Sequence, residues 1–446
     1  MDDASGYHFP KRFLWGTATS AHQVEGYNVA NDWWAWEQAD ARRPASGAAC
    51  EWWARAEEDI ARMADLHTNA HRLSIEWSRI EPSPGVWNPD AIARYRAILQ
   101  ALCAAGIRPM VTLHHFTNPL WVAEQGGWTN PEVVAWFRRF VSKAVTDLAD
   151  LCDLWCTINE PTVMATHGYI SRRWPPGKFS VRGYFQTVYH QLCGHAAAYE
   201  AIHSIQPHAQ VGLAHHMTLW RPRSDTALDR RATRFLEQAF SKLPLEALSD
   251  GVWRPSFGRV RCVPHLKNTL DWIGVNYYER YDAHFDPHLP GQLFLNIGPH
   301  PGAEAGPRGW GEIYPIGMFL CLWQLHRQFG LPIYITENGR PDENDANRPR
   351  FILEHLRQVW RTLSHDMFVR GYFFWSLLDN FEWSEGYDPR FRFGLYTVDR
   401  ETQTRTLRMS GRLYGDIAKA GGITIDVVRR YAPELADTFF MSRRGG

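Results

Sequence analysis

Two short polar runs each place a glutamate where a buried strand is expected to end. Glu337 lies in the run ITENG (335–339), which continues the apolar, β-rich residues 331–335. Glu160 lies in the run TINEP (157–161), directly after the apolar residues 154–158. A pair of carboxyl groups that face each other across a cleft can cleave a glycosidic bond, one as a general acid and the other as a nucleophile or base.

The elements that would position these glutamates alternate between strand-like and helix-like patterns from one end of the chain to the other. No linker rich in Pro, Gly or Ser interrupts them, and no glycine-rich phosphate fingerprint follows the first strand. The strands are expected at 13–16, 71–77, 109–113, 154–158, 211–214, 272–276, 333–336 and 371–376. Helices are expected near 52–66, 89–105, 131–150, 181–205, 226–241, 317–329, 349–365 and 410–420, and 281–311 is expected to be a loop excursion.

Eight such units predict an α/β fold, a closed (β/α)8 TIM barrel with extended βα loops. Because barrels of this kind commonly run past ~250 residues with insertions, the 446 residues are expected to form a single catalytic domain, 1–446. Reactive groups stand at the carboxyl ends of barrel strands, and strands four and seven lie on opposite sides. Glu160 and Glu337 would therefore face each other across the mouth. The alternative is two unrelated acids in surface salt bridges.

The spacing of the two carboxyl groups would decide the stereochemistry. A separation of ~5–5.5 Å leads to retention through a glycosyl-enzyme, whereas ~6.5–9.5 Å leaves room for a water and leads to inversion. Further residues at the expected strand ends are of hydrogen-bonding or ring-stacking types that suit sugar hydroxyls and a pyranose face. They are Gln23, Glu25, Arg72, His115, Asn276, Tyr278 and Trp375.

Composition excludes several other classes of function. Lys+Arg and Asp+Glu are equal at 48 each, so nothing predicts binding to nucleic acid or to an anionic membrane. No apolar run approaches the ~20 residues of a membrane span, and no secretory signal is recognised after the acidic start 1–4. Seven scattered cysteines fit reduced thiols, and no His or Cys spacing indicates a metal site. We expect a cytoplasmic protein without metal or cofactor, and the oligomeric state is not predicted.

Seven runs, in order along the chain, resemble the motifs of glycoside hydrolase family one, the retaining β-glucosidases and β-glycosidases. They are FLWGTATSAHQVEG (13–26), RLSIEWSR (72–79), TLHHF (112–116), TINEP (157–161), NYY (276–278), ITENG (335–339) and WSLLDNFEW (375–383).

The resemblance implies a role for each matching residue. Glu160 would be the acid/base and Glu337 the nucleophile, with Arg72 and Tyr278 steadying Glu337 and Asn276 supporting the same region. The sugar pocket would comprise Gln23, His115, Asn159, Glu382 and Trp383, with Trp375 as the stacking platform. Glu337 is expected to be ionised beside Arg72, and Glu160 is expected to begin protonated because its charged partner opposes ionisation.

Hydrolysis of terminal β-D-glucosyl residues from a small glycoside or oligosaccharide is the implied activity, with transglycosylation and β-galactosyl or β-fucosyl substrates left open. A 6-phospho-β-glycosidase is the nearest alternative, but Glu382 would repel a phosphate. A thioglucosidase fits poorly because Glu160 is present, and a silent sugar-binding barrel is a third alternative. The sequence departs from the family pattern at Phe116, where altered stacking beside His115 is expected. It also departs at Trp310-Gly311 and at residues 390–394, where altered leaving-group preference is expected.

Overall fold

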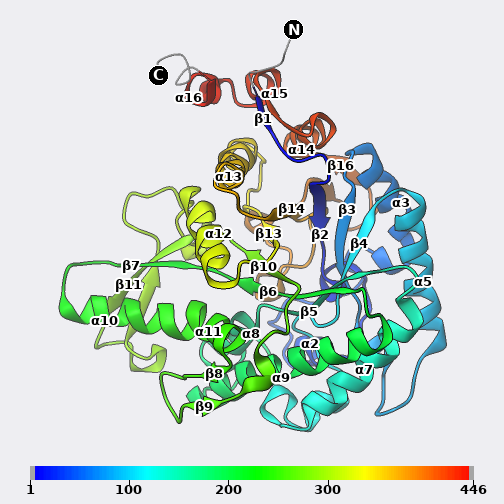
Figure 1. Ribbon diagram of the computed structural model, residues 1–446, viewed down its shortest axis with the longest axis vertical. Coiled ribbons are helices and arrows are strands. Elements are labelled where there is room, and N and C mark those ends of the chain that lie inside the picture. The colour runs from blue at the N-terminus through cyan, green and yellow to red at the C-terminus, as the bar shows by residue number, and fades with distance from the viewer. Residues whose placement is uncertain (1–5, 441–446) are drawn as a thin grey trace.

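A closed barrel of eight parallel strands forms the centre of the computed structural model, which describes residues 6–440 (Figure 1). Around the barrel the order is β2, β3, β4, β5, β6, β10, β13 and β14. Their bounds are Leu14–Ala18, Ala70–Ser74, Arg108–Thr112, Leu154–Asn159, Gln210–His216, Trp272–Asn276, Ile333–Asn338 and Val369–Trp375. The predicted TIM barrel is confirmed, while the acidic start 1–4 lies outside the described residues.

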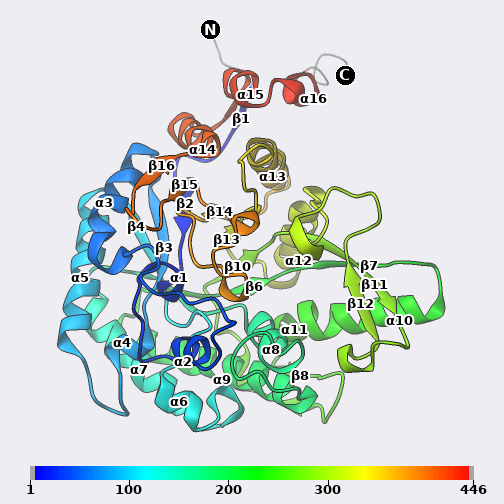
Figure 2. The ribbon, with the colours of Figure 1, turned by 180° about the vertical axis from the view of Figure 1, so that it is seen from behind.

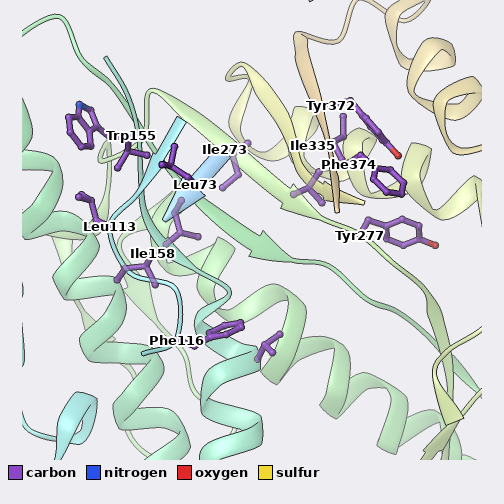
Figure 3. Packing of buried hydrophobic residues seen from close by; sticks show 14 of the residues in the cluster. Leu73, Leu113, Phe116, Trp155, Ile158, Ile273, Tyr277, Ile335, Tyr372 and Phe374 are labelled. Carbon is purple, nitrogen blue, oxygen red and sulfur yellow. The ribbon is translucent and has the colours of Figure 1, made fainter. Parts of the chain in front are cut away.

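Both faces of the barrel strands are buried, as expected of a parallel sheet covered by helices. One set of side chains fills the barrel interior, including Met110, Cys156 and Trp272. The alternate set, including Leu73 and Ile335, belongs to the large apolar cluster shared with the surrounding helices (Figure 3). This packing holds the carboxyl ends of the strands in fixed positions around one mouth.

Helices alternate with the strands and cover the barrel. They are α3 Trp52–Asp65, α5 Pro89–Ala104, α7 Val133–Leu148, α9 Val181–Ile205, α12 Ile316–Phe329, α13 Arg348–Leu363 and α14 Met409–Ala420. Local signals set their ends: the Asn88 side chain accepts from two backbone N–H groups at the start of α5, and Gly330 ends α12 in the left-handed region. All seven agree with the predicted positions to within about two residues at each end.

The predicted loop excursion at 281–311 is wrong. It contains β11 Arg280–Phe285 and β12 Leu295–Gly298, and β11 pairs with both β12 and β7 Leu219–Pro222 in a three-stranded sheet outside the barrel (Figure 2). The strands were missed because they are short and interrupted by Pro- and Gly-rich turns, so no long alternating pattern is visible. Their apolar residues form a small separate core with α10 Ala227–Leu236.

Two other boundaries differ from expectation. The helix predicted over 226–241 is α10 followed by a π-helical turn, Glu237–Lys242, and α11 Leu243–Asp250. Strand β3 ends at Ser74, three residues before the predicted end, and a helical turn α4, Trp77–Ile80, follows. Both differences arise where one type of regular structure passes almost directly into another, so that the apolar pattern continues across the boundary.

The remaining elements connect or close the barrel. They are α1 Ala21–Val24, α2 Asp32–Gln38, α6 Leu120–Glu124, α8 Pro161–Tyr169, α15 Ile425–Tyr431, α16 Ala436–Phe440, and the strand pairs β1 Gly6–His8 with β17 Gly422–Thr424, β8 Val252–Trp253 with β9 Arg261–Cys262, and β15 Tyr396–Val398 with β16 Arg405–Leu407. Between residues 6 and 440, no helix has the length and apolar character needed to span a membrane.

Candidate active site

Both glutamates singled out in the sequence follow an irregularity in their strands. In β13 the pairing with β10 and β14 gains one residue just before Glu337, and in β5 the pairing with β6 gains one residue before Asn159. Such bulges re-aim the side chains that follow them. Glu160 then adopts a left-handed conformation, with φ 45° and ψ 64°, as the residue that precedes α8. Two strands of a regular barrel are thus locally distorted where the carboxylates emerge.

The turn after Glu337 requires a glycine. A side chain at Gly339 would place its Cβ 2.0 Å from the carbonyl oxygen of Trp375, at the end of the neighbouring strand β14. Since real Cβ atoms do not approach a carbonyl that closely, only glycine fits here. The close approach brings Trp375 and Glu337 to the same part of the barrel mouth.

Glu337 is buried, and each of its carboxylate oxygens has its own partner. Arg72 donates to Oε1 in a buried ion pair, and the Tyr278 hydroxyl donates to Oε2 at 2.6 Å. Burial raises the pKa of Glu337 to about 7, the Arg72 cation opposes this rise, and the charge of Glu160 adds to it. The two donors hold the carboxylate in one orientation at the cavity wall.

Glu160 is held by a different pair of donors on a single oxygen. Asn276 Nδ2 lies 2.7 Å from Oε1, and Nδ1 of His216, at the end of β6, lies 3.0 Å from the same atom. His216 Nε2 lies 3.5 Å from Glu279. Because both partners bind Oε1, Oε2 is the oxygen left to act on another molecule.

Protonation at Glu160 differs from the expectation drawn from the sequence. Burial favours its protonated form, but the neighbouring His216 and the hydrogen bonds from His216 and Asn276 hold its pKa below the ordinary value. Burial likewise opposes a charge on His216, yet Glu160 and Glu279 outweigh it and raise the pKa of His216 to about 10. The proton of this cluster therefore rests on the imidazole in the free protein, one hydrogen bond away from Glu160.

Three buried side chains, Arg72, Asn159 and Asn276, connect the carboxylate of Glu337 to that of Glu160 behind the cavity. Asn159 Oδ1 accepts from Arg72 at 2.7 Å and from Asn276 at 3.1 Å, and Asn159 Nδ2 lies 3.2 Å from His115 Nε2. Thr336 donates to Asn276 Oδ1 at 2.6 Å. The network fixes the side chains around Glu337 and Glu160 relative to each other, so that neither carboxylate has to be ordered when a substrate arrives.

Both carboxylates line one cavity of about 260 Å³ at the barrel mouth. Aromatic rings make most of its wall, and His115 stacks between Trp375 and Trp383 at centroid distances of 5.9 and 6.2 Å. Flat rings beside buried carboxylates are suited to bind a sugar, whose C–H faces and hydroxyls differ in polarity. Of the predicted residues, those that line the cavity are His115, Glu160, Tyr278, Glu337, Trp375, Glu382 and Trp383.

The other predicted residues lie behind this wall. Gln23 donates to Glu382 Oε2 at 3.3 Å and to the Phe381 carbonyl at 2.8 Å. Arg72, Asn159 and Asn276 belong to the network described above. Glu25 is bound by Tyr95 and Arg79, each at 2.7 Å, which gives it a structural partner on each oxygen. Direct sugar contacts by Gln23 and Asn159 therefore stay predictions.

Glu382 is the third carboxyl group at this cavity. Burial, together with the charges of Glu337 and Glu385, raises its pKa to about 8. A carboxyl group in this state can both donate and accept hydrogen bonds. It can therefore bind two sugar hydroxyls at neutral pH.

The segments that depart from the family motifs pack around the same cavity. Trp310 and Phe393 both line it, with ring centroids 5.6 Å apart, and Trp310 also contacts Phe391 at 6.2 Å. Phe116 contacts Trp174 at 4.9 Å and Trp383 at 5.2 Å. The two unusual loops thus meet each other, and a substitution in one changes the surroundings of the other.

Two residues of the site were missed by sequence reasoning. His216 and Glu279 carry no motif, and the pair His215-His216 was interpreted as packed or hydrogen-bonded histidines. His215 fits that interpretation, because it is buried and lies 2.9 Å from the Ser241 carbonyl. The position of His216, at the carboxyl end of a predicted barrel strand, was the signal that could have identified it.

Comparisons with known proteins agree with this geometry. Residues 5–423 match the model of glycosyl hydrolase family 1. A β-glycosidase from Pyrococcus horikoshii superposes with a TM-score of 0.88 at 37% identity, covering 96% of this chain and 98% of that one. Beta-glucosidase A of Thermotoga maritima is 30% identical over 93% of this chain and 98% of its own length. A 6-phospho-β-glucosidase of Bacillus subtilis is 28% identical over 95% of this chain and 100% of its own.

Proposed function

We propose that this chain, which belongs to glycosyl hydrolase family 1, is a retaining β-glucosidase in which Glu337 is the nucleophile and Glu160 the acid/base. Family membership makes it a β-glycosidase, and the β-glucosidase and β-glycosidase relatives support the choice of substrate. One observation carries the assignment of roles. Glu337 is held by a guanidinium and a phenol on both oxygens, whereas Glu160 keeps one oxygen free on the same cavity.

In the first step Glu337 attacks the anomeric carbon while Glu160 protonates the departing oxygen. Arg72 stabilises the carboxylate form of Glu337 that attacks, and Tyr278 keeps its second oxygen in place. Because His216 keeps Glu160 ionised in the free protein, Glu160 takes up a proton from solvent before this step. That proton then leaves Oε2, because Oε1 is bound by His216 and Asn276. The glycosidic bond breaks, and a glucosyl ester of Glu337 forms.

In the second step Glu160 removes a proton from water, which attacks the same carbon. The ester at position 337 carries no charge, so the repulsion that Glu337 exerted on Glu160 has disappeared. The imidazolium of His216 favours the carboxylate form of Glu160 that this step needs. Hydrolysis of the ester releases glucose with its configuration retained and restores the nucleophile.

An unphosphorylated sugar is the substrate that the cavity favours. Its described lining residues include four carboxyl groups, Glu160, Glu279, Glu337 and Glu382, and neither Lys nor Arg. The imidazolium of His216 also lines it, but it already pairs with Glu160 and Glu279. Arg173 and Arg308 lie near the outer opening, where both pair with Glu385. A phosphate on O6 would meet these acidic groups without a cation that is not already paired with one of them. The relative that acts on 6-phospho-β-glucosides keeps that substrate as the alternative.

Replacement of Glu337 by Gly tests the proposal. We expect hydrolysis of an aryl β-glucoside to be lost, and azide to restore turnover with formation of the α-glucosyl azide, because the small anion enters where the carboxylate was. Retention of wild-type activity by Glu337→Gly would contradict the nucleophile assignment. Glu57→Gln, a change on the exposed face of α3, is the control for handling and expression.

A panel of substrates separates the sugar alternatives. We expect the highest kcat/KM with an aryl β-glucoside, lower values with the galactoside and fucoside, and none above background with the 6-phosphoglucoside. A preference for the phosphorylated sugar would overturn the assignment of substrate while leaving the family and the catalytic pair intact.

Two further expectations go with this proposal. Residues 1–446 are proposed to form one catalytic domain, because no linker rich in Pro, Gly or Ser interrupts the sequence. A cytoplasmic location is supported by the seven cysteines, all of which are unpaired although four are buried in the core.

A further inference from the structure

A cavity away from the barrel mouth gathers arginine side chains beside aromatic rings. It lies where the first turns of α9 meet the segment that carries β8 and β9 (Figure 1). Its volume is about 480 Å³, which is within the ordinary range for small-molecule sites. Its lining includes Arg182 on α9, Arg259 just before β9 and Arg261 on β9, and we call it the basic cavity.

The three arginines of the basic cavity have no acidic partner. Within residues 6–440 none of them pairs with a carboxylate, and the described lining contains no Asp or Glu. Arg254 in the same segment shows the contrast, because it does not line the cavity and binds Asp250 at 2.6 Å. Acidic and basic residues are equal in number in the chain, so this excess of positive charge is a local feature that attracts an anion.

Aromatic rings form the rest of the wall around these arginines. Tyr189 packs edge-on against the buried Trp253, with ring centroids 5.4 Å apart, and the Arg261 guanidinium lies 5.5 Å from the Tyr189 centroid. Phe257 also lines the cavity, although its side chain is 57% exposed. An exposed flat ring beside guanidinium groups can stack on a planar ring of a ligand.

The basic cavity is separate from the sugar cavity, since none of the residues described as lining one also lines the other. A further cavity of about 460 Å³, the apolar chamber, shares Val181 and Phe185 with the basic cavity and Thr166, Trp220 and Phe240 with the sugar cavity. The other residues that line the chamber include Ile170, Tyr184, Phe235, Leu236, Leu295 and Ile297. A ligand of the basic cavity is therefore not the sugar that is cleaved.

We propose that the basic cavity binds a small molecule that carries both a planar ring and a phosphate group, as a nucleoside phosphate does. A guanidinium binds phosphate through paired hydrogen bonds, and a phosphate monoester carries close to two negative charges at neutral pH, so it can engage more than one arginine. Phe257 and Tyr189 offer their faces to the ring. This activity goes beyond glycoside hydrolysis and does not depend on it.

A small molecule fits these observations better than a nucleic acid strand does. Proteins that follow a long phosphate backbone carry an extended basic stripe and a large positive charge. Here the net charge is zero, and the three arginines gather at one cavity.

Titration calorimetry of the full chain with adenosine monophosphate, adenosine and inorganic phosphate tests the inference. We expect the nucleotide to bind about tenfold or more tightly than either of the other two, because only the nucleotide engages both the arginines and the rings. A nucleotide that binds no more tightly than inorganic phosphate, or no more tightly than adenosine, would overturn the inference. So would a single-stranded oligonucleotide that binds more tightly per phosphate than the nucleotide, since the cavity would then belong to a nucleic-acid site.

Arg259→Gln and Arg261→Gln each remove one positive charge from the basic cavity, and both positions are exposed, so the fold should be kept. Each variant is expected to bind the nucleotide about tenfold more weakly, because a hydrogen bond to a charged group is lost. Arg254→Gln is the matched control and should bind as the wild type does, since Arg254 lies in the same segment but outside the cavity. Wild-type affinity in both variants, or an equal loss in the control, would overturn the inference.

Phe257→Ala tests the ring contact separately. It should weaken binding of the nucleotide and leave binding of inorganic phosphate unchanged, because it removes a stacking surface but no charge. Equal losses for the two ligands would contradict the stacking role. All four variants should hydrolyse an aryl β-glucoside as the wild type does, so a failure of nucleotide binding and a failure of the proposed function are told apart.

Discussion

The sugar cavity and the apolar chamber share three residues but are built from opposite materials. Glu160 and Glu337 are joined by a continuous hydrogen-bonded network of Arg72, Asn159 and Asn276. The chamber is lined mainly by hydrocarbon, and its charged lining residues are Arg172 and Arg173. One region must hold charges in place for bond cleavage, whereas the other only has to exclude water.

The two regions also differ in where they come from. The charged residues stand at the ends of barrel strands, where bulges and a required glycine fix them to within a narrow geometry. The chamber wall comes from a sheet inserted between barrel strands, whose residues need only be apolar and of suitable size. Substitutions in the first region should change chemistry, and those in the second should leave the chemistry itself unchanged.

Glu160→Ala is expected to have the largest effect that distinguishes the two regions. For glucosides with poor leaving groups, kcat/KM should fall by a factor on the order of 10²–10⁴, because the departing oxygen is no longer protonated. Substrates whose leaving group is already a stable anion should lose much less. Steady-state rates with a series of aryl glucosides of graded phenol pKa measure the difference.

An equal loss for every leaving group would contradict the acid role of Glu160. The loss would then come from weaker or misplaced binding of the sugar. Such a loss would not distinguish the sugar cavity from the apolar chamber. Leu320→Asp serves as a control, because Leu320 is exposed, lies on α12 and lines neither cavity.

The charged region was the part that the sequence could predict. Glu160 and Glu337 follow apolar runs, carry neighbours that break regular structure, and lie within family motifs, so three independent patterns agreed on them. His216 was missed, because one histidine after an apolar strand has the same pattern whether it packs in the core, as His215 does, or binds a carboxylate. Its role depends on Glu160, more than fifty positions earlier in the chain.

The apolar region could not be predicted in the same way. Strands β11 and β12 are short, lie among Pro and Gly, and pair partly with β7, about sixty residues away, so local patterns do not indicate a sheet. Cavities also depend on how side chains fill space, which spacing alone does not specify. The chamber became visible only once Phe240 and Ile297 had been placed in three dimensions.

Tyr278→Phe should have the next largest effect. It removes the hydroxyl that donates to Glu337 Oε2 and keeps the ring. Since a hydrogen bond to a charged group contributes about 1.5–3 kcal/mol, kcat should fall about tenfold to a hundredfold. Steady-state rates with an aryl β-glucoside measure the loss, and an unchanged kcat would contradict the role of this hydrogen bond in the sugar cavity.

His216→Asn should shift the pH profile more than the rate at the optimum. The imidazolium holds the pKa of Glu160 down, so its removal should raise that pKa and keep Glu160 protonated to higher pH. The basic limb of kcat/KM against pH should therefore move upward. His215→Asn, the matched control, should leave the limb in place, because burial lowers the pKa of His215 to about 4 and it carries no charge at neutral pH. A basic limb that stays in place in His216→Asn would contradict the influence of His216 on Glu160.

Glu382→Gln is expected to have the smallest effect, a change in stability of the substrate-free protein. Burial and neighbouring charges raise the pKa of Glu382 to about 8, so the folded state binds a proton that the unfolded state releases near pH 4.5. Glu382 therefore contributes less to stability as the pH rises from about 4.5 to 8. The Gln side chain does not ionise, so the thermal midpoint of the variant relative to the wild type should rise by roughly 2 °C between pH 5 and pH 8. Calorimetry at the two pH values measures this, and Glu57→Gln, which removes an exposed partner of Arg94, should give no such rise. A relative midpoint that stays constant over this range would show that the charge on Glu382 is well solvated in the folded protein, and a relative midpoint that falls would contradict the raised pKa.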